Sequence, residues 1–138
     1  MRKVTWGMLG TATIAKRNTI AGMKKASNCR LYAVAGRNHE KVNQYVKEYG
    51  FEKGYYSYDE LLDDPEIEAV YIPLPNSLHY EWVVKAVAKK KHVLCEKAFT
   101  INAKQAMDLC NLAKENNVLL CEAIWTRYQP MRQIINDV

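Results

Sequence analysis

The chain has 138 residues and a formal net charge of +5, with 49% of its residues hydrophobic and 25% charged. These values are typical of a single folded domain with a substantial core, and they exclude a disordered or fibrous chain. No apolar run approaches the roughly 18 residues of a membrane-spanning helix. The lysines are scattered, apart from one run at residues 89–91, so we expect anionic small-molecule ligands and no nucleic acid or membrane partner.

The start of the chain and its cysteines both favour a cytoplasmic protein. The first residues lead directly into a predicted strand and leave no room for a signal peptide. None of the four cysteines has C-x-x-C spacing: Cys29, Cys95, Cys110 and Cys121. We predict that they are reduced, mostly buried thiols and that the chain has no metal site.

Strand and helix patterns alternate along the chain. Apolar runs predict six strands, over residues 4–9, 30–35, 54–56, 69–72, 92–95 and 118–121. Helical patterns lie between them, over residues 13–27, 42–49, 57–65, 80–88 and 102–113. This alternation predicts a doubly wound α/β (Rossmann) domain with a parallel sheet and right-handed crossovers over residues 1–122.

The tail over residues 123–138 does not fit this pattern. Its apolar residues resemble one face of a segment that packs on something further along: Trp125, Tyr128, Met131, Ile134 and Ile135. We expect the tail to be the linker to, or the start of, a second domain that the chain does not include.

A glycine-containing turn follows the first strand. From Gly10 the sequence is G-x-A-x-x-A, a softened form of the dinucleotide-binding G-x-G-x-x-G/A pattern. Gly10 permits a tight turn, and alanine at the next two positions of the pattern lets a pyrophosphate approach the start of a helix. The pattern predicts cofactor contacts from Gly10, Thr11, Ala12, Thr13 and Ile14, although a strand–turn–helix without a ligand would look similar.

The end of the second strand indicates which cofactor binds. An NAD site usually carries a carboxylate there, whereas this chain has Arg37 after Gly36. A guanidinium suits a 2′-phosphate, and Lys41 lies one helical turn further on. The pattern favours NADP, with NAD possible. The alternative is that Arg37 is an ordinary surface residue.

Two further strand ends complete the predicted site. After the fourth strand, two prolines hold a loop extended, Asn76 is predicted to cap the next helix, and we expect Leu74, Pro75 and Asn76 to wall the nicotinamide side. His79 in that helix is predicted to be structural or a minor cofactor contact.

After the fifth strand comes Glu96-Lys97, and charge directly after a buried strand is costly unless it is paired or used. The Lys97 ammonium is suited to steady a developing alkoxide and relay a proton.

With these motifs in place, the chain resembles the Gfo/Idh/MocA oxidoreductase family. The matching stretches run through almost the whole chain: residues 7–15, 58–62, 71–79, 93–97 and 122–127. The last stretch, with Trp125 and Arg127, looks most like the branch of dimeric dihydrodiol dehydrogenase and NADP-dependent xylose dehydrogenase. The resemblance implies an NAD(P)-binding Rossmann domain, followed by a second domain that holds the substrate and often forms the dimer.

The resemblance also assigns roles. The family's catalytic lysine, in its Glu-Lys-Pro motif, falls on Lys97, and Glu96 beside it is implied to be a catalytic and cofactor-binding residue. The resemblance also adds Trp125 and Arg127 to the cofactor contacts. The chain departs from the family at Ala98, where the family has a proline that commonly follows a strained or cis bond. Ala12 replaces the middle glycine, and Gln129 stands where relatives often have an aromatic residue or histidine.

The family's acid/base histidine lies in the second domain, so the resemblance implies that this chain alone binds cofactor and is inactive. We predict an NADP-dependent oxidoreductase that transfers a hydride to or from a sugar, polyol or dihydrodiol and forms a homo-oligomer through its second domain. The alternative is a non-catalytic NAD(P)-binding sensor, which the Ala98 departure motivates.

Overall fold

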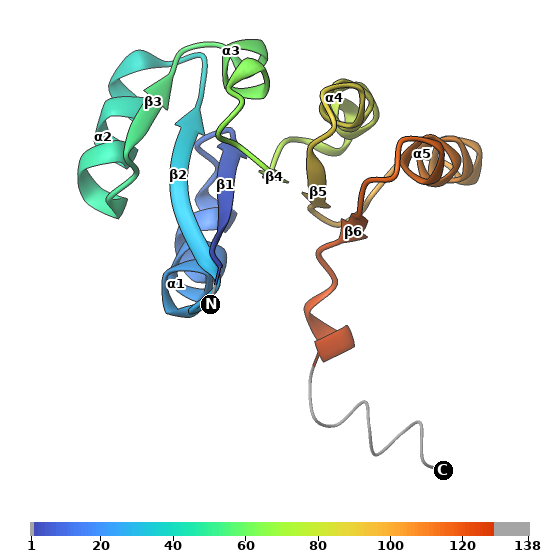
Figure 1. Ribbon diagram of the computed structural model, residues 1–138, viewed down its shortest axis with the longest axis horizontal. Helices are drawn as coiled ribbons and strands as arrows, with labels where there is room; N and C mark the ends of the chain where they lie inside the picture. Colours follow the sequence, from blue (N-terminus) through green and yellow to red (C-terminus); the bar gives the residue numbers. More distant parts are fainter. Residues whose placement is uncertain (1, 129–138) are drawn as a thin grey trace.

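The computed structural model describes residues 2–128 and shows the expected doubly wound α/β fold (Figure 1). Six parallel strands form one sheet in the order β3-β2-β1-β4-β5-β6. The strands are β1 (Val4–Leu9), β2 (Cys29–Ala35), β3 (Lys53–Tyr55), β4 (Ala69–Ile72), β5 (His92–Cys95) and β6 (Leu120–Glu122). The strand order reverses direction at β1, so the carboxyl ends of β1 and β4 flank the crevice where such sheets bind ligands.

Helices cover both faces of the sheet. The helical elements are η1 (Ala15–Thr19), α1 (Ile20–Lys25), α2 (His39–Tyr49), α3 (Tyr58–Asp63), α4 (Asn76–Ala88), α5 (Ala103–Glu115) and η2 (Trp125–Tyr128). Figure 1 shows α3, α4 and α5 on one side and α1 with α2 on the other. Within residues 2–128, no helix is both long and apolar enough to cross a membrane.

Each face has its own hydrophobic core. Leu61, Val83 and Leu109 pack from α3, α4 and α5 against one face of the sheet. Ile20 and Tyr45 pack from α1 and α2 against the other face, around strand residues such as Met8, Val34 and Tyr71. Two apolar faces explain why the central strands consist of nearly continuous apolar runs instead of alternating ones.

The first helix departs from a regular α-helix. Helical backbone extends over residues 13–25, close to the predicted 13–27, but η1 is a π-helical turn. The amide of Ile20 donates to the carbonyl of Ala15, five residues earlier, where an α-helix would use four. One inserted residue rotates the later side chains of the helix by about 100° around its axis.

Two predictions about local structure were wrong. Asn76 does not cap α4: it is the first helical residue, and Pro75 occupies the N-cap position, because the Leu78 amide already donates to the Pro75 carbonyl at 2.8 Å. Nor are the cysteines mostly buried, since only Cys95 is. Cys110 is exposed, although it follows Leu109, one of the two buried residues of α5.

Most of the remaining boundaries shift by one or two residues, whereas α2 begins three residues and α4 begins four residues before the predicted 42–49 and 80–88. Ser57 and Asn102 begin their helices as predicted, accepting hydrogen bonds from the amides of Asp59 and Gln105. The last strand lies over 120–122 instead of the predicted 118–121. Its first residue, Leu120, pairs with Val93 of β5. Gln129 and the apolar tail residues Met131, Ile134 and Ile135 lie outside the described residues.

Candidate cofactor and catalytic site

The turn after β1 requires a glycine at position 10. Gly10 has a φ of +110°, and a Cβ there would lie 3.0 Å from Cδ2 of Leu74. Its amide donates to the Ala35 carbonyl at 2.8 Å, which ties the turn to the end of β2. Gly36, directly after β2, also lies close to this turn, since a Cβ added there would lie 3.4 Å from Cγ2 of Thr11. The two loops therefore meet at short range because neither glycine adds a side chain.

The start of the first helix is held in place beside this turn. The carbonyl of Ala12 accepts hydrogen bonds from the Tyr45 hydroxyl and the Ala15 amide, both at 3.1 Å. Burial, aided by Tyr49 and Glu48, raises the pKa of Tyr45 to about 12, so its hydroxyl remains a donor. Thr13 and Ile14 are exposed, and the helix that begins here has no acidic residue in its first turn. An anion can bind there.

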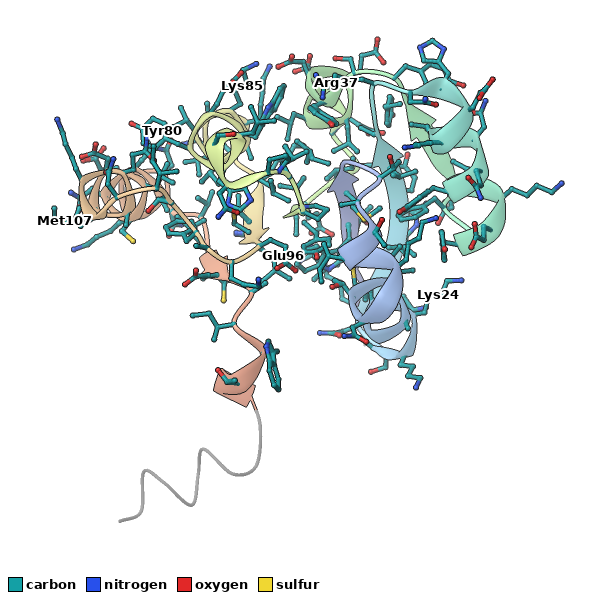
Figure 2. All side chains as sticks on the ribbon, turned by 180° about the vertical axis from the view of Figure 1, so that it is seen from behind. Lys24, Arg37, Tyr80, Lys85, Glu96 and Met107 are labelled. Carbon is teal, nitrogen blue, oxygen red and sulfur yellow. The ribbon has the colours of Figure 1, made fainter. Side chains whose placement is uncertain are left out.

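The end of β2 presents cations to solvent. Arg37 and Lys41 are both exposed, and Asn38 caps α2 by accepting the Lys41 amide at 3.0 Å. In Figure 2, Arg37 lies well apart from Glu96. The predicted 2′-phosphate contact and the predicted catalytic pair therefore occupy different parts of the site, as an extended dinucleotide would require.

His79 joins the loops that follow β4 and β5. Its side chain is fully buried. Nε2 lies 2.7 Å from the Leu74 carbonyl oxygen, and Nδ1 lies 2.9 Å from that of Ala98 and 3.2 Å from that of Phe99. The geometry fits the structural role predicted for His79. Leu74 is buried against the turn, while Pro75 and Asn76 are exposed.

Several hydrogen bonds fix the loop that carries Lys97. The Glu96 amide donates to the Ile72 carbonyl at 3.1 Å, and the Phe99 amide donates to Oε1 of Glu122 at 2.8 Å. Oε2 of Glu96 accepts the Lys97 amide at 3.2 Å. The Lys97–Ala98 peptide bond is cis. The Lys97 side chain is exposed, so a held backbone presents the ammonium to solvent.

Cys95, directly before this loop, is not a nucleophile. Burial, together with the nearby carboxylates of Glu122 and Glu96, raises the pKa of its thiol to about 12. A thiolate is the reactive form of cysteine, and it is scarce at neutral pH when the pKa is this high. Among residues 2–128 there is also no group of three or more His, Cys, Asp or Glu side chains that could hold a metal ion.

A cavity of about 470 Å³ opens beside Lys97. It is lined by Ile14, Asn18, Thr19, Leu94, Glu96, Lys97, Ala123, Ile124 and Trp125. The volume is within the range of small-molecule sites. Trp125 is 69% exposed and Ile14 is 45% exposed, which is unusual for large apolar side chains and leaves apolar surface for a ligand or another part of the protein.

The cavity brings together only some of the predicted site residues: Ile14, Glu96, Lys97 and Trp125. The other turn residues (10–13), the Arg37 region and the loop before α4 lie outside its lining, and Arg127 belongs to η2. Sequence reasoning missed five lining residues: Asn18, Thr19, Leu94, Ala123 and Ile124. Asn18 and Thr19 are polar residues in the middle of a helix, which is a weak signal of a site. The π-helical turn that contains them was not predicted from the sequence.

This geometry defines a class of protein: a Rossmann domain with a glycine-containing turn after its first strand. The chain matches the GFO_IDH_MocA model, an oxidoreductase family with an NAD-binding Rossmann fold, over residues 4–123. The chain therefore belongs to the Gfo/Idh/MocA oxidoreductase family, and the resemblance predicted from the sequence is confirmed.

Its relatives include both enzymes of the predicted branch. The chain is 37% identical to D-xylose 1-dehydrogenase (NADP(+)) 2 of Haloferax volcanii, over 93% of this chain and 39% of the relative. It is 31% identical to trans-1,2-dihydrobenzene-1,2-diol dehydrogenase of Mus musculus, over 96% of this chain and 40% of the relative.

Among solved structures, KijD10, a 3-ketoreductase from Actinomadura kijaniata in complex with NADP and TDP-benzene, has a TM-score of 0.94 and 31% identity. The match covers 99% of this chain and 42% of that chain. The chain thus spans about two fifths of the length of these proteins.

Proposed function

We propose that this chain is the cofactor-binding domain of an NADP-dependent oxidoreductase that acts on an alcohol or ketone of a sugar, polyol or dihydrodiol. The observation that carries the proposal is the placement of Lys97. It lines a cavity together with Ile14, which follows the turn after β1, and Trp125. The relatives named for NADP-dependent and dihydrodiol dehydrogenation support the same chemistry.

The residues present fit an NADP molecule. The absence of side chains at Gly10 and Gly36 lets the two loops approach closely, and the start of the first helix, which has no acidic residue in its first turn, would supply amide donors for the pyrophosphate. Arg37 and Lys41 would hold the 2′-phosphate, where an NAD site usually has a carboxylate. The proposed outer contacts are Leu74, Pro75 and Asn76 on the nicotinamide side, and Trp125 and Arg127 beyond β6.

Lys97 would act at the oxygen of the reacting carbon. Bound NADP supplies the hydride acceptor or donor. When an alcohol is oxidised, negative charge develops on its oxygen, and the Lys97 ammonium stabilises that charge by hydrogen bonding. In the reverse direction the ammonium donates to the carbonyl oxygen as it becomes an alcohol. Glu96 lines the same cavity and fixes the Lys97 backbone.

The remainder of the enzyme would lie beyond this domain. The last strand ends at Glu122, and the apolar surface of Ile124 and Trp125 is exposed just after it. We propose that residues 1–122 form the cofactor domain and that 123–138 lead into a second domain. That domain would provide the substrate contacts, an acid/base histidine and a homo-oligomer interface, so the chain alone would bind NADP without turnover.

Replacing Lys97 in the full-length protein tests the proposal. Turnover of D-xylose and of trans-1,2-dihydrobenzene-1,2-diol with NADP⁺ is measured for the unmutated protein, Lys97→Met and the matched control Lys104→Met, an exposed lysine on α5. We expect Lys97→Met to lower turnover about a hundredfold, or ~2.7 kcal/mol. Its NADP affinity should change far less, because a contact made in the transition state leaves ground-state binding nearly unaltered.

Thermal stability separates catalysis from structure. If Lys97 only formed a structural ion pair, Lys97→Met would melt at a lower temperature while keeping its activity per folded molecule. Near-normal turnover in a folded Lys97→Met protein would contradict the proposed mechanism. NADP binding without any turnover by the full-length protein would favour a sensor.

A further inference from the structure

Three polar side chains, those of Thr19, Tyr71 and Glu96, form a continuous hydrogen-bonded line that ends in the loop of Lys97. Oγ1 of Thr19, in the π-helical turn, lies 3.1 Å from the Tyr71 hydroxyl. The same hydroxyl donates to Oε1 of Glu96 at 2.6 Å. The three residues come from η1, from the middle of β4 and from the loop after β5. The line therefore connects the first helix with the proposed catalytic loop.

Tyr71 is an unusual residue for its place in the fold. It is fully buried, and its strand neighbours in the parallel ladder are Met8 and Leu94. A phenylalanine would fill this apolar position without needing a polar partner. Burial, followed by the hydrogen bond to Glu96, raises the pKa of the phenol, so Tyr71 keeps its proton at all ordinary pH. The hydroxyl is therefore a permanent donor.

The direction of each bond follows from the number of protons. A phenol has one proton, and an ionised carboxylate only accepts, so the Tyr71 proton points to Glu96. The Tyr71 oxygen is then left to accept from the Thr19 hydroxyl. Since donation into Tyr71 makes its own proton a better donor, the two bonds reinforce each other.

Both oxygens of Glu96 are occupied in this way. Oε1 accepts from Tyr71, and Oε2 accepts the backbone amide of Lys97. We propose that Thr19 and Tyr71 are positioning residues that orient the Glu96 carboxylate so that it holds the Lys97 backbone at the cavity. The functional part of this inference rests on the proposed role of Lys97.

Thr19 is the last residue of the π-helical turn, and it contacts Tyr71 from that position. Asn18 and Thr19 both line the cavity with Glu96 and Lys97. The irregular turn thus contains the hydroxyl that meets the Tyr71 phenol.

Tyr55 provides a matched control. Its hydroxyl also donates to a carboxylate at 2.6 Å, that of Asp64, and its side chain does not line the cavity. Tyr71→Phe and Tyr55→Phe therefore each remove one phenol–carboxylate hydrogen bond, and Tyr71→Phe removes the bond to Thr19 as well. Thr19→Val removes the first hydroxyl of the line while keeping the shape of the side chain. Thr19→Ser is a separate variant that keeps the hydroxyl.

The test measures hydrogen exchange of the Lys97 backbone amide by NMR on this chain. We expect Tyr71→Phe to speed its exchange about fivefold, the net effect of weakening one hydrogen bond. Thr19→Val should have a smaller effect, Thr19→Ser almost none, and Tyr55→Phe none. In the Tyr71→Phe background, Thr19→Val should add nothing, because it acts through the missing hydroxyl.

A functional measurement accompanies the structural one. In the full-length protein with D-xylose as the probe, Tyr71→Phe should lower kcat about tenfold and leave the KM for NADP nearly unchanged. Unaltered Lys97 exchange in folded Tyr71→Phe, or in Thr19→Val if the first variant does not fold, would overturn the inference. The exchange measurement uses neither cofactor nor substrate, so its failure is distinguishable from failure of the Lys97→Met test.

Discussion

Replacing Gly10 with alanine should destabilise the domain markedly. A φ of +110° is strained for any residue with a Cβ, at a cost of about 1–3 kcal/mol. The new Cβ would lie 3.0 Å from Cδ2 of Leu74, which is buried and must move by a few tenths of an ångström. Together these effects should lower the free energy of unfolding by about 2–3 kcal/mol. The melting temperature should fall by about 4 °C for each kcal/mol.

Gly22→Ala is the matched control for this change. Gly22 lies in α1, is exposed, and has no atom within 4 Å of the position of an added Cβ. Alanine should stabilise that helix by about 0.5–1 kcal/mol. Urea denaturation of the two variants at 25 °C measures both changes. A Gly10→Ala protein as stable as the unmutated one, beside a stabilised Gly22→Ala, would refute the steric reasoning.

Two other changes have defined outcomes. Ala12→Asp should abolish dinucleotide binding while the fold survives, because it adds a negative charge at the proposed pyrophosphate site; unchanged binding by calorimetry would place the cofactor elsewhere. Burial raises the pKa of Asp64, but hydrogen bonds from Tyr55, the Glu66 amide and Lys53 outweigh it and lower the pKa from 3.8 to about 2. Asp64 therefore stabilises the fold above pH 3.8 and loses this effect as the pH falls to about 2. Lys53 is half-exposed, so the stabilisation by Asp64 is at most about 2 kcal/mol. Urea curves measured at pH 5 and pH 2.5 should show this loss of stability in the unmutated protein and not in Asp64→Asn.

Local chemistry predicts most of this fold. The strands over 69–72 and 92–95 are predicted with their observed bounds, since apolar runs are bounded by strong signals such as Pro73. The last strand shifts because pairing with β5, and not its own composition, sets its register. Capping at Pro75 could not be predicted from residue preference, since Asn76 is the better capping residue by type.

The site was harder to predict than the fold. Gly10 stands out because it begins a dinucleotide-binding pattern. Lys97 stands out because it is a charged residue close after a buried strand. Thr19 and Tyr71 do not, because their roles depend on a π-helical turn and on contacts across 52 residues of sequence. A tyrosine in a buried strand indicates only packing until its hydroxyl has a known partner.

The choice of cofactor tests the central claim most directly. Calorimetry on this chain should show that NADP(H) binds at least about tenfold more tightly than NAD(H), or ~1.4 kcal/mol. Arg37→Ala should erase most of this preference and leave NAD(H) affinity nearly unchanged, since the guanidinium would contact only the 2′-phosphate. Equal affinities of the unmutated chain for the two cofactors, or no binding of either, would contradict the account.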